Sequence, residues 1–344
     1  MSTRHLDVPS LVDMKQIIQE KFGLLPCTWQ LQSAQYQLDN KDIVTISPTS
    51  SSKTLTFWIP LLFNPGRIII IVTPLNILGE KNQKEAEAYG FPAINLCKET
   101  ATDQVFKVCN EVLLYIFFVN VVQDIERLQY CVIIVSPERI LGDVHFQALW
   151  KSKKFTSKIF NVTFDEGHCI SEWGKDFRPQ YSELGNLRWY LPDHVTVHVV
   201  SATMPPHILA DVTSKLRIRP YNLARVTRSN NHPNISLIVE EMKFPRNTMH
   251  DLTRVLDMRL GDINPPQKFM IFTNSRTSAE MTCNRLHSDL PVHLWGKIVW
   301  FHSGMTMMFR IDAISKLQEG GLWGICCTDA AGMVSDNFFL IFAY

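Results

Sequence analysis

The chain lacks the patterns that mark metal-stapled, disulfide-linked or secreted proteins. Its eight cysteines include no Cys-x-x-Cys pair, and no two histidines have zinc-finger spacing, so a structural zinc site is not expected. A disulfide framework is not expected either, because the chain has 344 residues and its first residues show no basic-then-apolar leader pattern. We therefore expect reduced core thiols in a soluble, intracellular protein.

The sequence also lacks a long apolar run and an excess of one charge. Its longest apolar run, residues 112–119 continuing into 121–122, is shorter than the roughly 20 residues that a membrane span needs. The 34 basic and 33 acidic residues leave a net charge of +1. Any binding of nucleic acid would therefore have to come from local patches.

What the sequence does contain is a series of short, continuous β-branched runs. In the first part of the chain these runs are residues 43–46, 67–73, 131–136, 159–164 and 195–201. Runs without alternation are typical of strands that are buried on both faces of a parallel sheet. Stretches with helical spacing lie between them, for example residues 79–89. The alternation predicts an α/β domain with helices on both faces of the sheet.

A second, shorter series of elements begins after Pro220. Its expected strands and helices are residues 269–272, 298–301 and 323–327, and residues 277–287 and 310–318, respectively. The segment between the two series, residues 227–233, is polar and rich in turn-forming residues. We therefore expect two domains, residues 1–225 and 226–344.

A candidate phosphate-binding loop follows the strand expected at residues 43–46. Residues 47–54 read Ser-Pro-Thr-Ser-Ser-Ser-Lys-Thr and lead into an apolar, helix-like run. Backbone N–H groups and a helix N-terminus can cradle phosphate there, with Lys53 supplying positive charge and Thr54 a magnesium ligand. Glycine is usual at the positions of Ser50, Ser51 and Ser52. A serine-rich, helix-capping turn is the alternative interpretation of this loop alone.

An acidic pair, Asp165-Glu166, follows the strand expected at residues 159–164. In nucleotide hydrolases an aspartate at such a strand end holds magnesium, and a neighbouring glutamate polarises the attacking water. Acidic pairs also occur as simple caps, but the Lys-Thr loop about 110 residues upstream makes the hydrolase interpretation more specific.

The stretch that follows, His168-Cys-Ile-Ser-Glu-Trp-Gly-Lys-Asp-Phe-Arg-Pro179 and then Tyr181, resembles a family signature. It is similar to the RecQ-like family of superfamily 2 DNA helicases, in which a DEAH box runs into an aromatic-rich loop. Gly167 stands where that family usually has alanine, which we take as a small-for-small exchange. Trp173 and Phe177 can stack on single-stranded bases, and Arg178 can bind phosphate or sense the nucleotide. A core aromatic patch is the alternative.

The resemblance covers about residues 20–333 and implies two RecA-like lobes with parallel sheets, the second lobe incomplete. It implies ATP and Mg²⁺ as cofactors, DNA as partner (single strands and duplex junctions), 3′-to-5′ movement and a nuclear location. Catalytic roles fall to Lys53, Asp165, Glu166 and His168. The further roles that it implies are adenine reading by Gln30, ATP contacts by Thr49, Ser50, Ser51, Ser52, Lys53 and Thr54, magnesium binding by Thr54 and Asp165, DNA contacts by Pro74, Trp173, Phe177, Arg178, Asn274 and Arg276, and coupling by Ser201, Thr203 and Asp329.

Three features depart from the family pattern: the serine loop, the apolar stretch at residues 111–122, and Val334 in place of glycine near the last residues. The family's next motif, with arginines that reach the γ-phosphate, does not follow. Such an arginine contributes about 10³–10⁵ in rate, so we expect weak hydrolysis by this chain. Translated intron sequence would explain the last two departures, and a decayed paralogue is the rival explanation.

Two other functions stay open at this point. A catalytically inert nucleic-acid-binding protein would keep the fold and the aromatic loop, and the serine loop favours it. The intact Lys53-Thr54 and Asp165-Glu166 favour an active motor. An RNA helicase of the broader superfamily is disfavoured by the loop at residues 171–179.

Overall fold

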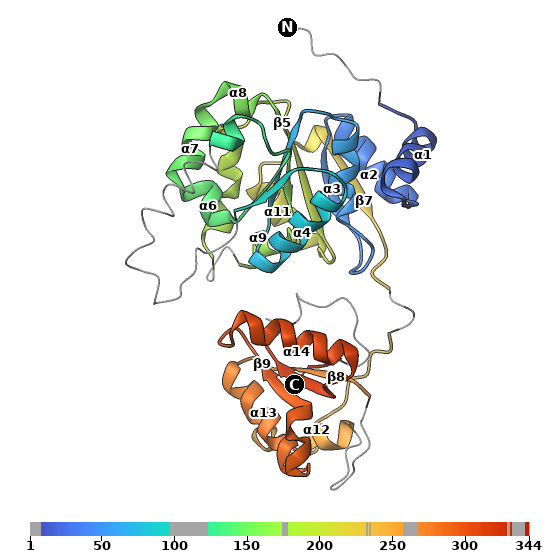
Figure 1. Ribbon diagram of the computed structural model, residues 1–344, viewed down its shortest axis with the longest axis vertical. Coiled ribbons are helices and arrows are strands. Elements are labelled where there is room, and N and C mark those ends of the chain that lie inside the picture. Colours follow the sequence, from blue (N-terminus) through green and yellow to red (C-terminus); the bar gives the residue numbers. More distant parts are fainter. Residues whose placement is uncertain are drawn as a thin grey trace. The chain divides into compact units, whose positions relative to one another are not determined.

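The computed structural model describes residues 8–96, 123–173, 178–231, 233, 235–256, 267–328, 331 and 341–343. The chain divides into two compact units, Met1–His232 and Pro233–Tyr344 (Figure 1). The boundary expected near residue 225 lies inside strand β7 (Leu223–Thr227), which pairs with a strand of the first unit. The division by contacts therefore falls a few residues later than the sequence indicates.

The first unit is built on a seven-stranded sheet in which every described pairing is parallel. The strand order is β3-β4-β2-β5-β6-β1-β7. In chain order the strands are β1 (Asp42–Ile46), β2 (Ile68–Val72), β3 (Ala93–Asn95), β4 (Val132–Val135), β5 (Ile159–Phe164), β6 (Thr196–Ser201) and β7. Because the strands are parallel, the loops that follow them all leave from the same edge of the sheet.

Helices cover both faces of this sheet (Figure 1). One face packs against α1 (Leu11–Phe22), α2 (Thr28–Leu38), α3 (Leu55–Leu62) and α4 (Asn76–Ala88). The other face packs against α6 (Pro137–Gly142), α7 (Val144–Lys151), α8 (Lys153–Thr156), α9 (Cys169–Glu172), α10 (Gln180–Glu183), the 3₁₀ helix η1 (Leu184–Trp189) and α11 (Pro206–Lys215).

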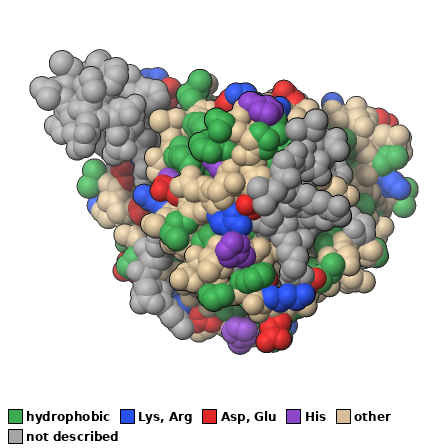
Figure 2. All heavy atoms as spheres, turned by 90° about the horizontal axis from the view of Figure 1, so that it is seen from below, with side chains coloured by type: hydrophobic (Ala, Val, Ile, Leu, Met, Phe, Trp, Pro, Cys, Tyr) green, Lys and Arg blue, Asp and Glu red, His purple; other side chains and the backbone are tan. Residues whose placement is uncertain are grey.

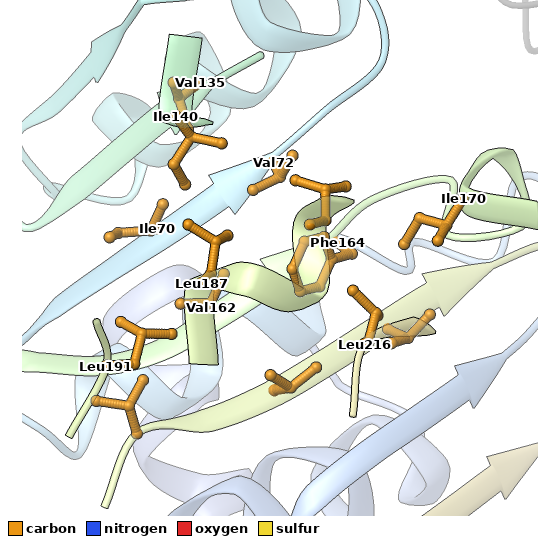
Figure 3. Packing of buried hydrophobic residues seen from close by; sticks show 14 of the residues in the cluster. Ile70, Val72, Val135, Ile140, Val162, Phe164, Ile170, Leu187, Leu191 and Leu216 are labelled. Carbon is orange, nitrogen blue, oxygen red and sulfur yellow. The ribbon is translucent and has the colours of Figure 1, made fainter. Parts of the chain in front are cut away.

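Alternate residues of each central strand enter one of two apolar cores. Along β2, Ile70 and Val72 join one core, whereas Ile69 and Ile71 join the other. Figure 3 shows the first core, where Leu187 of η1 lies over β2 and β5. Both cores are closed to water, which explains why these strands read as continuous apolar runs rather than alternating ones.

The second unit has a four-stranded parallel sheet in the order β11-β8-β10-β9. Its strands are β8 (Phe269–Phe272), β9 (Ile298–Phe301), β10 (Gly324–Cys327) and β11 (Ile341–Ala343). Its helices are α12 (His250–Val255), α13 (Arg276–Ser288) and α14 (Met307–Glu319), with short 3₁₀ helices η3 (Arg246–Thr248) and η4 (Val292–Lys297); a further one, η2 (Pro220–Asn222), precedes β7 in the first unit. The α/β class expected from the sequence is thereby confirmed for both units.

The described surface residues carry charges of both signs. On the face drawn in Figure 2, basic, acidic, histidine and apolar side chains of the described residues are interspersed. This agrees with the nearly balanced charge of the sequence. Among the described residues, no helix has the length and apolar character that a membrane crossing requires.

Candidate nucleotide and nucleic-acid site

The motifs singled out in the first part of the sequence gather at one edge of the large sheet. β1, β6 and β5 are neighbours in the sheet, so the loops after them are adjacent. Backbone hydrogen bonds join these loops directly: Ser47 N donates to Ser201 O at 3.1 Å, and Gly167 N donates to Val200 O at 2.8 Å. The serine loop, the acidic pair and the Ser201 segment therefore form one constellation.

The serine loop adopts the backbone geometry that its sequence resists. Ser50 has φ +61° and Ser52 has φ +55°, both in the left-handed region that glycine adopts without strain. Ser51 between them has no such angle, and its hydroxyl donates to the Pro48 carbonyl at 2.6 Å. The loop therefore keeps a glycine-type shape with serine residues, and two of the three positions where glycine is usual carry backbone strain.

Two side chains, those of Gln30 and Lys53, donate hydrogen bonds to backbone carbonyls of this loop. The amide of Gln30, at the first turn of α2, donates to the carbonyls of Ser51 at 3.2 Å and Ser52 at 3.0 Å. The same side chain accepts from the Cys27 backbone N–H at 2.7 Å, which caps α2. Lys53 Nζ donates to the Pro48 carbonyl at 3.2 Å. Gln30 thus contacts the loop directly, and its expected role in reading adenine stays a prediction.

The acidic pair lies within electrostatic reach of the loop lysine. Burial raises the pKa of Asp165 to about 6, the negative charge of Glu166 adds to this rise, and the positive charge of Lys53 opposes it. Burial also raises the pKa of Glu166, again opposed by Lys53. These mutual effects require Lys53, Asp165 and Glu166 to lie within electrostatic reach of one another. A cation near these carboxylates would favour their charged forms. The described residues contain no cluster of three or more His, Cys, Asp or Glu side chains that could hold a metal, so magnesium binding by Thr54 and Asp165 stays a prediction.

Two residues of α4 that the sequence motifs do not include contact this group. Asn82 Nδ2 donates to Asp165 Oδ2 at 3.3 Å, and Thr54 Oγ1 donates to Glu85 Oε1 at 2.7 Å. Asn82 and Glu85 are three residues apart and so lie on the same face of the helix. That spacing was the available signal, but nothing in the sequence showed that this face turns toward the loop.

His168 links the acidic pair to the Ser201 segment. Its Nδ1 lies 2.9 Å from Ser201 Oγ and 3.4 Å from Glu166 Oε2. The Ser201 hydroxyl donates to the Thr203 carbonyl at 2.8 Å, so the proton between His168 and Ser201 belongs to Nδ1. Burial lowers the pKa of His168, which favours the neutral ring. The arrangement supplies the contact that coupling would need, and the role itself stays a prediction.

Arg178 connects three segments of the first unit, two of which hold residues that the resemblance assigns to DNA contact. Its guanidinium makes a two-point contact with Glu138, at 2.7 Å and 2.8 Å, and also donates to the Pro74 carbonyl. The rings of Trp173 and Tyr181 flank it, with their centroids 5.9 Å and 5.4 Å from Cζ. The two aromatic rings meet edge to face at 5.8 Å. Arg178 thus connects segments within the first unit, and any contact with DNA or nucleotide would come in addition to these hydrogen bonds.

The remaining expected site residues are placed as follows. Thr49 is exposed on the serine loop, and Asn274 and Arg276 are exposed after β8 in the second unit, where Arg276 donates to Ser303 Oγ at 2.8 Å. Phe177 and Asp329 lie outside the described residues, as do residues 111–122 and Val334.

Gly167 is more than a small-for-small exchange, and this corrects the expectation from the sequence. A Cβ at this position would lie 2.3 Å from Val199 Cγ1 on β6. Such a distance is far inside van der Waals contact, so Val199 occupies the space that an alanine methyl would need. The glycine and the valine are matched to each other in this chain.

Comparison with known proteins agrees with this geometry. A family model described as DEAD/DEAH box helicase matches residues 27–212, more than half of the chain. The ATP-dependent DNA helicase RecQ of Haemophilus influenzae is 27% identical over 296 residues, which cover 86% of this chain and 42% of that protein. The probable ATP-dependent DNA helicase RecS of Bacillus subtilis is 29% identical, covering 87% and 54%. The ATP-dependent DNA helicase Q1 of Mus musculus is 28% identical, covering 96% and 48%.

Solved structures show the same fold. The DUF1998 helicase MrfA bound to DNA matches with a TM-score of 0.65 at 16% identity, covering 99% of this chain and 47% of that one. Dbp5 of S. cerevisiae bound to RNA and ADP BeF3 matches with a TM-score of 0.63 at 16% identity, covering 94% and 75%. The chain spans about half the length of the three curated relatives above. It belongs to the DEAD/DEAH box helicase family, and it resembles the RecQ-type DNA helicases over most of its length.

Proposed function

We propose that this chain is the motor part of an ATP-dependent DNA helicase of RecQ type. The observation that carries the proposal is the contact of His168 with both Ser201 and Glu166, within a group in which Lys53 lies in electrostatic reach of Asp165 and Glu166. Hydrolysis of ATP would drive translocation on single-stranded DNA and opening of duplex junctions, with 3′-to-5′ polarity and a nuclear location as the resemblance implies. Curated relatives that bear the name DNA helicase support this substrate.

Each residue of the site has a distinct task in this proposal. Lys53 neutralises phosphate charge, and Thr54 and Asp165 would hold magnesium. The bound metal would neutralise charge on the phosphate oxygens. Glu166 orients and polarises the attacking water, and its burial keeps its carboxylate basic. His168 reports the state of the acidic pair to the Ser201-Thr203 turn.

The contact surface for DNA would lie beside Arg178. Trp173 is half-buried and packs against the core, so only part of its ring is free to stack on a base. Arg178 holds the segments at Pro74 and Glu138 in fixed register. Asn274 and Arg276 of the second unit would add contacts to the DNA backbone.

A catalytically inert DNA-binding protein is the second candidate, and the positive φ angles of Ser50 and Ser52 favour it. Strain in the loop that would cradle phosphate lowers affinity for the nucleotide, or slows its turnover, without removing a surface for DNA.

Strand separation on tailed duplexes tests the proposal. We expect displacement of the shorter strand from a DNA duplex with a 3′ single-stranded tail, only with ATP and Mg²⁺, and none from a duplex with a 5′ tail. Glu166→Gln should bind the same DNA but separate no strands. Binding without separation by the unaltered protein would support the inert alternative, and separation of RNA duplexes in preference to DNA would overturn the assignment of substrate.

A further inference from the structure

The helix that follows the serine loop, α3, is interrupted by a proline. Pro60 is buried inside this helix. A proline has no N–H to donate to the carbonyl four residues earlier, which here belongs to Thr56. Thr56 is wholly buried, so its carbonyl cannot turn to water for a partner. An unmet carbonyl at this depth would be costly, so the hydrogen bond must come from elsewhere.

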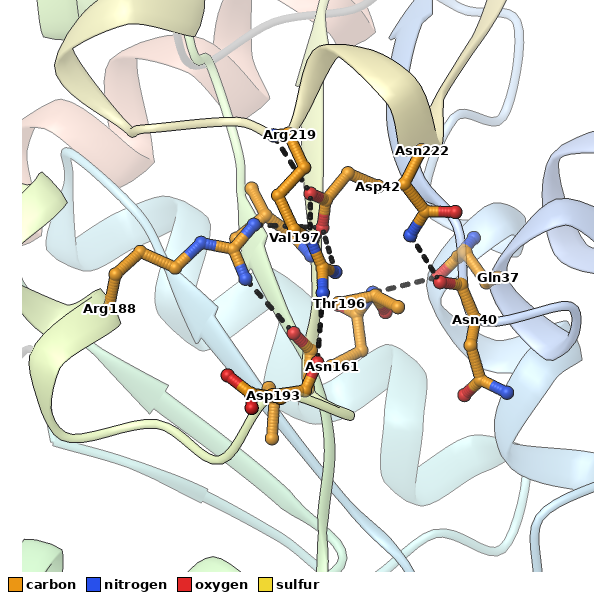
Figure 4. A network of polar contacts seen from close by, with 11 residues as sticks. Gln37, Asn40, Asp42, Asn161, Arg188, Asp193, Thr196, Val197, Arg219 and Asn222 are labelled. Carbon is orange, nitrogen blue, oxygen red and sulfur yellow. Dashed lines mark hydrogen bonds and ion pairs between the residues drawn. The ribbon is translucent and has the colours of Figure 1, made fainter.

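Gln37, on the last turn of α2, supplies that hydrogen bond. Its Nε2 donates to the Thr56 carbonyl at 3.0 Å and to the Ser33 carbonyl at 3.2 Å. Its Oε1 accepts from Asn161 Nδ2 of β5 at 3.3 Å, and Figure 4 shows the two side chains together. Gln37 is itself 0% exposed. The side-chain amide of Gln37 therefore forms hydrogen bonds with groups on α2, α3 and β5, and both its nitrogen and its oxygen take part.

Two partners of Gln37 are connected to different parts of the candidate nucleotide site. Thr56 contacts the serine loop, and Asn161 lies on the strand that precedes the acidic pair. Thr56 contacts the loop lysine through two hydrogen bonds, because both its N–H and its hydroxyl donate to the Lys53 carbonyl, at 3.0 Å and 2.7 Å. Asn161 lies on β5, the strand that ends directly before Asp165, and it is held there by hydrogen bonds with Thr163 and Thr196 at 2.7 Å and 3.1 Å. All of these residues except Lys53 and Asp165 are completely buried.

We infer that Gln37 is a positioning residue for the nucleotide site. It replaces the helical hydrogen bond that Pro60 removes and bridges α3 to β5. It thereby sets the spacing between Lys53 on one side and the Asp165-Glu166 pair on the other. The link to nucleotide rests on the proposed function, whereas the order of α3 and its loop depends only on the contacts described.

A double-mutant cycle with Pro60 isolates this role. Gln37→Met keeps the length of the side chain but removes its donors and acceptor. Pro60→Ala gives residue 60 an N–H that can donate to the Thr56 carbonyl within the helix. If Gln37 acts through that carbonyl, Gln37→Met should reduce nucleotide affinity much less in a protein that already carries Pro60→Ala than in one that keeps Pro60. Gln32 is exposed on the same helix, so Gln32→Met is the matched control.

Two readouts decide the outcome: affinity for a fluorescent N-methylanthraniloyl-ATP with Mg²⁺, and amide hydrogen exchange over residues 47–62. We expect Gln37→Met to weaken binding about tenfold, as for loss of one buried hydrogen-bond partner, and to speed exchange in this segment. Gln32→Met should change neither quantity. Beside Pro60→Ala the loss of affinity should fall to about twofold.

Results that contradict the role of Gln37 can be told apart from results that contradict the proposed function. An equal effect of Gln37→Met with Pro60 and with Ala at residue 60 would overturn the inference, as would behaviour like that of Gln32→Met. If Gln37→Met alone does not fold, the double variant should fold, and its failure would also count against the inference. An unaltered protein that binds no nucleotide would contradict the proposed function, while the exchange data would still decide the role of Gln37.

Discussion

At Ser50 and Ser52 a single side-chain atom, Cβ, introduces backbone strain into the candidate site. A left-handed backbone angle costs a non-glycine residue about 1–2 kcal/mol, because Cβ approaches the carbonyl that follows. Glu166 has the same type of angle, with φ +48°, and it is the residue expected to activate water. Strain therefore lies on both sides of the group that would surround the γ-phosphate, which is where strained residues of functional sites tend to gather.

Replacing the strained serines by glycine should stabilise the loop. We expect Ser50→Gly or Ser52→Gly to raise the free energy of unfolding by about 0.5–1 kcal/mol, since the relief of strain exceeds the entropy that glycine adds to the unfolded chain. Ser51→Gly is the matched control, and it should destabilise because the hydroxyl bond to Pro48 is lost. Urea denaturation measures all three. Equal effects at the three positions would contradict the backbone geometry described.

Some residue-level features were within reach of the sequence and others were not. Lys53, Thr54, Asp165 and Glu166 stand in recognisable local strings, so short spacing along the chain identified them. Asn82 and Glu85 of α4, Gln37 of α2 and the pairing of Gly167 with Val199 depend on which helix face meets which strand. Such long-range contacts leave no pattern in one sequence.

Among the elements, β1 is held at both of its ends. Its last residue leads into the serine loop, and its first residue, Asp42, is a fully buried carboxylate that pairs with Arg188 and Arg219 (Figure 4). Asp42 also accepts from the Val197 N–H of β6 at 2.8 Å. Burial alone would raise the pKa of Asp42, but the hydrogen bonds from Arg219 and Arg188 outweigh it and hold the pKa below its ordinary value.

Removing this charge should weaken the whole first unit in a pH-dependent way. We expect Asp42→Asn to lower the free energy of unfolding by about 3 kcal/mol at pH 7, because two arginines lose their buried partner. A carboxylate with a lowered pKa stabilises the fold above its unfolded value of about 3.9, and this contribution is lost as pH falls through the lower folded value. The deficit of the variant should therefore shrink in acid.

Chemical denaturation at a series of pH values between neutral and acid checks this expectation. Asp39→Asn, at an exposed position close by in the sequence, is the control. It should leave the free energy of unfolding almost unchanged at every pH. A deficit for Asp42→Asn that is constant across the whole pH range would show that the charge of Asp42 contributes nothing to the fold.

The inner strands of the large sheet followed from the sequence, and its two edge strands, β3 and β7, did not. The strand expected at residues 159–164 coincides with β5, and the one at 43–46 differs from β1 by a single residue. β3 has three residues, too few to show a pattern. β7 lies at the edge of the sheet, where only alternate residues are buried, so it lacks the continuous apolar run that marked the central strands.

At the scale of the whole molecule, the two units differ in how much of the function they carry. The constellation of Lys53, Asp165, Glu166 and His168 lies entirely within the first unit. The second unit contributes a sheet of the same type, with Asn274 and Arg276 exposed at one end of it. The proposed function therefore rests on the first unit, whose serine loop and acidic pair we propose to be a working site for ATP hydrolysis.

DNA-stimulated ATP hydrolysis by the purified chain, with Glu166→Gln as control, is the decisive test of this site. We expect phosphate release that rises when single-stranded DNA is added and that disappears in the control. Release no greater than that of Glu166→Gln, from protein shown to be folded, would contradict it and leave DNA binding as the activity of this chain.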